Sequence, residues 1–193
     1  LSILDVKRGD IGSTMAGYAQ AYLSDDAPTA ADAITVSPYL GYGSLTPALN
    51  LAEANGRGVF VLALTSNPEG AGVQHAVNGD QAVAAGIVEG VTASNAQASG
   101  EGRLGSIGLV IGATVGGAVS DLGIDLQRAN GPLLAPGVGA QGAGPAELEA
   151  VFGTARRQVL ASTSRGVLKA GPSIDELRKA ASASAYEAAT ALR

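Results

Sequence analysis

The amino-acid sequence predicts an α/β fold in which helices cover a parallel sheet. Short apolar runs rich in β-branched residues alternate along the chain with alanine-rich segments of helical spacing. The apolar runs are hydrophobic at nearly every position, which is typical of strands that are buried on both faces of a parallel sheet. Glycine or proline at the ends of these runs supports their assignment as strands.

Six strands and six helices are expected, in alternation. The apolar runs predict strands at 1–6, 33–37, 58–65, 106–112, 131–135 and 158–162. The alanine-rich segments predict helices at 13–23, 44–55, 80–98, 115–128, 146–152 and 174–192. Six such units in 193 residues agree with the roughly 30 residues that one strand–helix unit needs.

The number of units favours a (β/α)8 TIM barrel of which only part is present. An eight-unit barrel takes about 250 residues, and this chain begins within a strand. We therefore expect six of eight βα units, with the first two missing, so that residues 1–193 form a single barrel domain that is N-terminally incomplete. A six-stranded doubly wound sheet is the alternative. No G-x-G-x-x-G motif follows the first strand, and polar residues end nearly every strand, which favours the barrel.

Composition and charge exclude several classes of function. The net charge of −5 argues against a nucleic-acid partner, which requires a basic surface. No apolar run approaches the roughly 18 residues of a membrane span. The sequence has no cysteine and one histidine, His75, so a thiolate or histidine metal centre and a Ser-His-Asp triad are not expected. The absence of cysteine fits a cytoplasmic protein.

Charged residues cluster at the end of the first predicted strand. Side chains alternate along a strand, so Asp5 and Lys7 should share the face that points into the barrel, at its catalytic rim. Burying opposite charges is costly unless they are paired, and active sites tolerate that cost. Asp10 and Ser13 would equally suit the start of the next helix. The stretch is thus either a charged catalytic array or a structural turn.

Polar or glycine-rich segments also follow three later strands. Ser66, in "TSNPEG", could contact a polar ligand, or the segment could form an Asn-Pro turn. The glycines of "APGVGAQGAGP" would let backbone N–H groups approach an anion. Arg165, in "STSRGVL", would lie beside them, where barrels often bind phosphate, and could grip a phosphate bidentately. The alternative for Arg165 is a surface ion pair with Glu69 or Asp175.

Four of these segments, in this order, resemble a known family. "LDVKRGDIGST", "TSNPEG", "APGVGAQG" and "STSRG" are similar to orotidine 5′-phosphate decarboxylases, particularly the bacterial subgroup with an Asp-Ala-Lys-Arg-Gly-Asp-Ile-like signature. Val6 replaces the usual small residue of that signature. The family also uses an aspartate from barrel strand 1 and a lysine from strand 2, and both are expected to lie before Leu1.

The resemblance implies decarboxylation of orotidine 5′-phosphate to UMP in de novo pyrimidine biosynthesis, without metal or organic cofactor. It implies that Lys7 donates a proton to C6 and that Asp5 lies beside the departing carboxylate. Asp10 would reach into the site of a partner subunit, in a homodimer with shared active sites. The substrate-binding residues that the resemblance implies are Ile11, Thr14, Ser66, Pro136, Gly139, Gln141, Gly142, Arg165 and Gly166.

Two other functions remain open at this point. A sister decarboxylase that acts on a sugar phosphate of the 3-keto-gulonate type shares the D-x-K-x-x-D layout but uses Mg²⁺. The "TSNPEG" and "GVGAQG" segments favour the pyrimidine nucleotide as the small-molecule substrate. The other alternative is a non-catalytic barrel fragment that retains phosphate binding.

Overall fold

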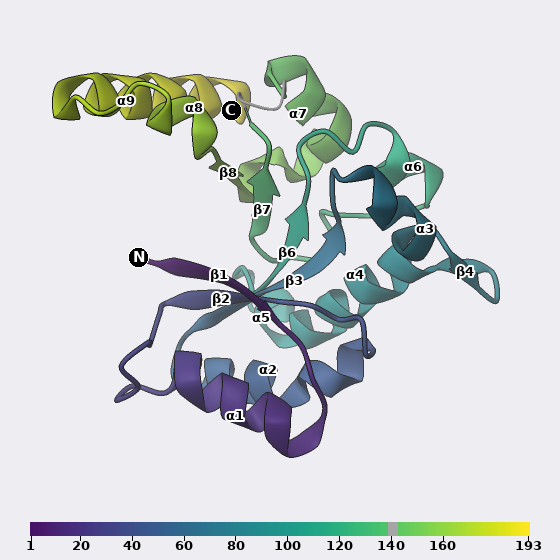
Figure 1. The fold of residues 1–193 in the computed structure, drawn as a ribbon. Coiled ribbons are helices and arrows are strands. Elements are labelled where there is room, and N and C mark those ends of the chain that lie inside the picture. The colour runs from purple at the N-terminus through teal and green to yellow at the C-terminus, as the bar shows by residue number, and fades with distance from the viewer. Residues whose placement is uncertain (139–142) are drawn as a thin grey trace.

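The structure is a computed structural model that describes residues 1–138 and 143–193. One parallel sheet of six strands forms its centre, in the order β1-β2-β3-β6-β7-β8 (Figure 1). These strands are β1 (Ile3–Arg8), β2 (Ala33–Val36), β3 (Gly58–Leu64), β6 (Ile107–Ile111), β7 (Leu133–Pro136) and β8 (Val159–Ser162). Each of these six strands pairs in parallel with the next of the six, as in a barrel, so the predicted α/β class and the six strands are confirmed.

The connections between these strands contain the helices. The longer ones are α1 (Gly12–Leu23), α2 (Thr46–Ala54), α4 (Val83–Ser94), α7 (Pro145–Phe152) and α9 (Ile174–Ala191). Shorter helical segments are η1 (Tyr42–Leu45), η2 (Pro68–Gly70), α3 (Ala71–Gln74), α5 (Ala96–Gly100), α6 (Ala118–Asp121), η3 (Gly153–Gln158) and α8 (Arg165–Leu168). In Figure 1, α1 and α2 lie beneath the β1–β2 part of the sheet, and α9 extends past β8 at the upper left.

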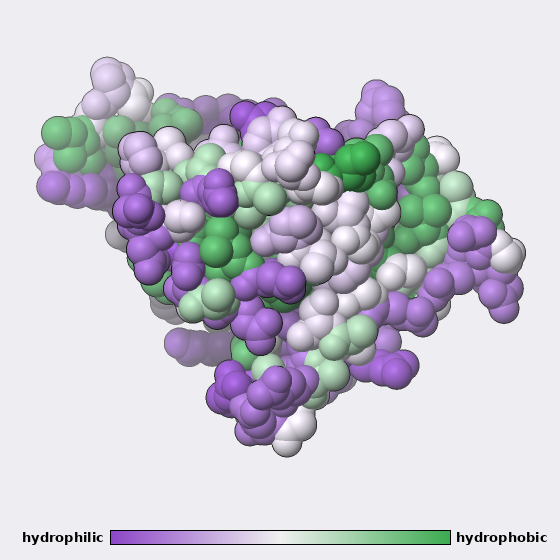
Figure 2. Space-filling model, turned by 90° about the horizontal axis from the view of Figure 1, so that it is seen from below, coloured by the Kyte–Doolittle hydropathy of each residue, from purple (hydrophilic) through white to green (hydrophobic). Residues whose placement is uncertain are grey.

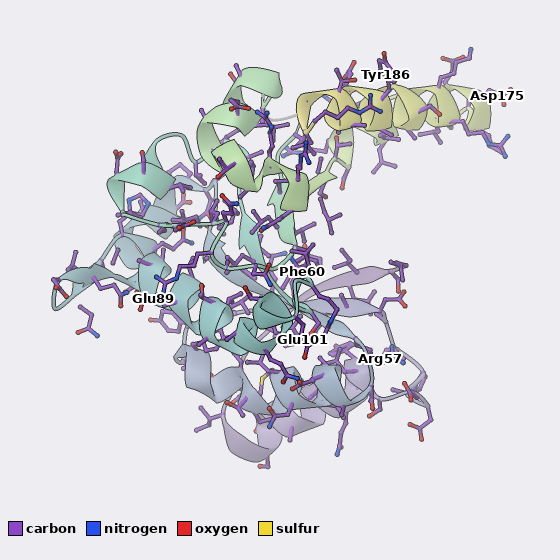
Figure 3. All side chains as sticks on the ribbon, turned by 180° about the vertical axis from the view of Figure 1, so that it is seen from behind. Arg57, Phe60, Glu89, Glu101, Asp175 and Tyr186 are labelled. Carbon is purple, nitrogen blue, oxygen red and sulfur yellow. The ribbon has the colours of Figure 1, made fainter. Side chains whose placement is uncertain are left out.

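The sheet has two different faces because side chains alternate along each strand. Ile34 and Val36 of β2 point to the helices and join the main hydrophobic core. Ala33, on the opposite face, belongs to a smaller apolar cluster with Phe60 and Val110. Phe60 is labelled near the middle of the sheet in Figure 3. The outer face of the curled sheet therefore packs against the helices in the main core. The inner face, with Ala33, Phe60 and Val110, lines a cavity.

The surface is mixed in character. Figure 2, which views the molecule from below, shows hydrophilic and hydrophobic residues interspersed on that face. Among the described residues, no helix is both long and apolar enough to cross a membrane.

Two of the predicted helices were wrong in extent. The helix expected over 115–128 is reduced to α6, because Gly116 and Gly123 take positive φ values of 60° and 65° and bound the helical turn. The helix expected from residue 80 begins at Val83, after a small hairpin of β4 (Val77–Asn78) and β5 (Gln81–Ala82) that turns at Gly79. That helix is also interrupted at Asn95, whose buried side chain donates to the carbonyls of Ile107 and Ala129.

Candidate active site

A cavity of about 1310 Å³ lies on the inner face of the sheet. Its lining includes Asp5 and Lys7 of β1, Ser66 just beyond the end of β3, and Pro136 at the end of β7. Active sites of parallel barrels are built at this end of the strands. The part of the cavity around these four residues is therefore the candidate active site.

Asp5 and Lys7 form an ion pair at the end of β1, in which Lys7 Nζ donates to Asp5 Oδ2. The predicted common face of these two residues is thus confirmed. Their side chains are 62% and 53% exposed, respectively. An ion pair with this much solvent contact contributes at most about 1 kcal/mol to stability. Stability is therefore a poor explanation for placing both charges here.

The backbone at Lys7 departs from regular strand geometry. In the pairing of β1 with β2, Leu4 lies opposite Ile34 and Arg8 opposite Val36, and the register shifts between them. Lys7 has a φ of 46°, in the left-handed region that residues with side chains seldom adopt. Its N–H donates to the hydroxyl of Thr35 at 3.0 Å. Strained backbone of this kind is concentrated at functional sites.

Gly9 lets the end of β1 approach Ser37, which follows β2, closely. A Cβ atom on Gly9 would lie 2.3 Å from the carbonyl oxygen of Ser37. The Ser37 N–H in turn donates to the Arg8 carbonyl at 2.7 Å, which restores the pairing after the irregular stretch. A residue with a side chain at position 9 would push the two strands apart just beyond Lys7.

The pKa of Asp5 is lowered from its ordinary value. Partial burial raises it, but hydrogen bonds from Lys7 and Thr35, together with the positive charge of Lys7, outweigh that effect. Thr35 donates to Asp5 Oδ1 at 2.9 Å. The carboxylate of Asp5 is therefore held ionised beside the Lys7 ammonium at neutral pH.

Asp10, Ile11 and Thr14 lie beyond the strand and are not among the residues that line the cavity. Asp10 Oδ1 accepts the Ile11 N–H at 2.8 Å. Ile11, which is 61% exposed, is the N-cap of α1, and no side chain caps that helix. The alternative in which Asp10 or Ser13 caps the helix is therefore wrong.

The segment after β3 is held by hydrogen bonds between side chains. Gln74 Oε1 accepts the Thr65 N–H at 2.9 Å, and Gln74 Nε2 donates to Thr65 Oγ1 at 2.7 Å. The Thr65 hydroxyl donates to Asn67 Oδ1 at 2.6 Å. Ser66, between them, lines the cavity. The segment thus forms the expected turn, in which the Gly70 N–H donates to the Asn67 carbonyl, while the contact of Ser66 with a ligand stays a prediction.

The ends of β7 and β8 bring further polar groups to the cavity. Thr163 and Ser164 line it, whereas Arg165 and Gly166, at the start of α8, are exposed and do not. Over residues 1–138 and 143–193, Arg165 forms no ion pair, so the pairing with Glu69 or Asp175 is not observed; Asp175 lies 4.0 Å from Arg178 instead. Gly139, Gln141 and Gly142 fall outside the described residues.

Sequence reasoning missed several residues that shape the site. Thr35 and Gly9 support the charged pair, Gln74 holds the loop of Ser66, and Thr163 and Ser164 join the cavity wall. Gly9 lies within the motif that was singled out, and "STSRG" contains Thr163 and Ser164. Thr35 and Gln74 carry no sequence signal of their own. His75 is exposed, and the described residues contain no group of three or more histidines or carboxylates that could hold a metal ion.

The chain is similar in sequence to a known protein family and to individual members of it. A sequence model of the "Orotidine 5'-phosphate decarboxylase / HUMPS family" matches residues 1–180. The orotidine 5'-phosphate decarboxylase of Streptomyces coelicolor is 58% identical over 194 residues, which are 100% of this chain and 67% of that protein. The one from Salinispora arenicola is 56% identical over 182 residues, which are 94% of this chain and 63% of that protein.

Solved structures agree with these sequence relationships. A crystal structure of a Streptomyces avermitilis protein matches with a TM-score of 0.91 and 57% identity, over 100% of this chain and 65% of that one. Leishmania donovani OMP decarboxylase matches with a TM-score of 0.72 and 30% identity, over 99% of this chain and 68% of that one. The chain spans about two thirds of the length of these relatives. Its six strands are part of a (β/α)8 barrel, and the chain belongs to the orotidine 5′-phosphate decarboxylase / HUMPS family.

Proposed function

We propose that the chain decarboxylates orotidine 5′-phosphate to UMP and carbon dioxide. The ion pair of Lys7 and Asp5 inside the cavity is the single observation that carries the proposal. Relatives at 56–58% identity that are named orotidine 5'-phosphate decarboxylase support this choice of substrate.

The proposed reaction needs a cation and a proton at one place. When the bond between C6 and the carboxyl carbon breaks, carbon dioxide leaves and the electron pair remains on C6. The Lys7 ammonium stabilises that developing charge and then transfers a proton from Nζ to C6. Asp5 orients the Lys7 ammonium through their ion pair, and solvent restores the proton after turnover. No metal or organic cofactor takes part in this scheme.

Substrate binding would use the remaining polar ends of the strands. We assign Ser66 to the pyrimidine and the ends of β7 and β8 to the phosphate, with Arg165 as the cation. The cavity-lining positions of Ser66, Pro136 and Ser164 support this orientation. Gly139, Gln141, Gly142 and Gly166 keep the roles implied by the family motifs. The phosphate is remote from C6, so its binding energy can be used to order the site around the substrate.

A second copy of the chain would complete the site. Asp10, Ile11 and Thr14 lie outside the cavity of their own subunit, and Ile11 exposes an apolar side chain. Both facts support the expected homodimer with shared active sites, in which Asp10 enters the partner's cavity. We further propose that residues 1–193 belong to one barrel domain. A cytoplasmic location is supported by the cysteine-free sequence.

Parallel turnover assays test this proposal. The 193-residue chain is offered orotidine 5′-phosphate or 3-keto-gulonate 6-phosphate, each with EDTA or with added Mg²⁺. We expect loss of orotidine 5′-phosphate absorbance that EDTA does not change. Turnover of the sugar phosphate that requires Mg²⁺ would replace our proposal with the sister activity. UMP binding without turnover of either compound would favour the phosphate-binding fragment.

A further inference from the structure

Thr35 is a buried polar residue on an otherwise apolar strand. All four residues of β2 are buried, and only 1% of Thr35 is exposed. A hydroxyl group removed from water destabilises the fold unless it finds hydrogen-bond partners in the protein. The partners of Thr35 therefore indicate what this hydroxyl does.

Both partners of the Thr35 hydroxyl belong to the charged pair of β1. The hydroxyl donates to Asp5 Oδ1 at 2.9 Å and accepts the Lys7 N–H at 3.0 Å. Lys7 Nζ closes the ring of contacts by donating to Asp5 Oδ2. Thr35 thus holds the side chain of one member of the pair and the backbone of the other.

The bond to Lys7 replaces a contact that the sheet itself does not supply. Between the pairs Leu4–Ile34 and Arg8–Val36, β1 advances four residues while β2 advances two. Regular ladder hydrogen bonds cannot continue through such an irregularity. Lys7 lies within it at a positive φ, and the Thr35 hydroxyl accepts its N–H where the ladder is interrupted.

We propose that Thr35 is a positioning residue for Asp5 and Lys7. Its hydroxyl fixes the irregular backbone at Lys7 and one oxygen of the Asp5 carboxylate, so that the Lys7 ammonium keeps one orientation in the cavity. Thr35 is not among the residues that line the cavity and acts through the other two. The effect on catalysis rests on the proposed function, whereas the positioning itself rests on the hydrogen bonds alone.

Two substitutions separate the hydroxyl from the packing of Thr35. Thr35→Val keeps the branched shape and removes the hydroxyl, whereas Thr35→Ser keeps the hydroxyl. The control is Thr92→Val, because the Thr92 hydroxyl donates to the Val88 carbonyl within α4. We expect Thr35→Val to lower kcat by about 10-fold or more with little change in KM, since one hydrogen bond to a charged group is lost. Thr35→Ser and Thr92→Val should retain kcat.

Nuclear magnetic resonance measures the positioning without turnover. Thr35→Val should raise the pKa of the Asp5 carboxyl, which loses a donor, and should speed exchange of the Lys7 amide hydrogen. Thr35→Ser should restore both values. An Asp5 titration and a Lys7 exchange rate that are the same in Thr35→Val and in the unmodified chain would overturn the inference.

The two proposals can fail separately. If the unmodified chain does not turn over orotidine 5′-phosphate, the proposed function fails, while titration and exchange still decide the role of Thr35. If Thr35→Val does not fold, the contact between Thr35 and Asp5 can be tested by a pH titration of the unmodified chain. The Thr35 side-chain resonances should then follow the Asp5 titration, and resonances that ignore it would contradict the contact.

Discussion

At the β1 end of the sheet, the charged residues are held by hydrogen bonds to each other and to Thr35, whereas at the β8 end Arg165 is exposed. Asp5 is bonded to both Lys7 and Thr35. Arg165 is exposed and forms no ion pair within the described residues. The helices differ in the same sense: α1 buries three residues, including Met15 and Leu23, whereas α9 buries none. In Figure 3, Asp175 and Tyr186 mark the length of α9, which extends away from the sheet.

We infer from this difference that the β1 end of the proposed site serves catalysis and the β8 end serves phosphate binding. Groups that act on the breaking bond gain from being oriented in advance, because reorientation during the reaction would raise the barrier. Groups that bind the remote phosphate can be ordered by the ligand itself, and that binding energy then helps to assemble the site. We therefore expect changes at the β1 end to affect kcat and changes at the β8 end to affect affinity.

Among substitutions that leave Lys7 in place, the largest effect is expected from Asp5→Asn. The substitution keeps the shape of the side chain but removes the charge that holds Lys7, so kcat should fall by roughly 100-fold or more. The affinity for UMP, measured by calorimetry, should change little. A weaker UMP affinity with an unaltered kcat would assign Asp5 to substrate binding and contradict the catalytic role of the β1 end.

Arg165→Ala tests the other end of the site. Loss of a charge-assisted contact should weaken UMP binding by about 10-fold to 100-fold and leave uridine binding unchanged. Arg178→Ala is the matched control, because Arg178 is an exposed arginine of α9. Equal UMP affinities for the unmodified chain and Arg165→Ala would remove Arg165 from the phosphate site.

Gly9→Ala tests how the end of β1 is built. The new Cβ would lie 2.3 Å from the Ser37 carbonyl oxygen, which forces the strands to shift. We expect the free energy of unfolding in urea to fall by about 1–3 kcal/mol. Gly17→Ala in α1 is the control, since nothing lies within 4 Å of its Cβ position, and it should stabilise the helix by about 0.5–1 kcal/mol. Equal free energies of unfolding for Gly9→Ala and the unmodified chain would show that the end of β1 can move away from Ser37 without loss of stability.

The smallest effect concerns stability as a function of pH. The folded-state pKa of Asp5 lies below its ordinary value of 3.8. The ionised carboxylate therefore stabilises the fold above the unfolded-state pKa, and this contribution is lost as the pH falls through the folded-state pKa. Because the pair is largely exposed, the contribution should stay below about 1 kcal/mol. Urea unfolding of the unmodified chain and Asp5→Asn should show a stability difference that shrinks on acidification; a difference that grows would contradict the lowered pKa.

For the end of β1, the sequence predicted which way the side chains of Asp5 and Lys7 point. It did not predict the hydrogen bonds with Thr35 that hold them. Strand alternation places Asp5 and Lys7 on one face, and the structure agrees. The irregular register at Lys7 depends on a hydroxyl 28 residues away in sequence, and a threonine within an apolar strand gives no sign of that contact. Non-local hydrogen bonds of this kind have no pattern in a single sequence.

Helix lengths show the same limit of local patterns. Apolar spacing over 115–128 favours a helix, but the glycines at 116 and 123 adopt positive φ and confine it to α6. The alternative ion pair for Arg165 failed for a related reason, because charge spacing along the chain does not fix which side chains meet in space. Asp175 lies near Arg178, which is its neighbour on α9.

Lys7→Ala, assayed for turnover and for UMP binding in the same preparation, separates proton donation from ligand binding. We expect orotidine 5′-phosphate decarboxylation to be lost while UMP is still bound, because Lys7 supplies the proton and the charge at C6 and the phosphate is held elsewhere. Turnover by Lys7→Ala at the rate of the unmodified chain would show that Lys7 is not the proton donor.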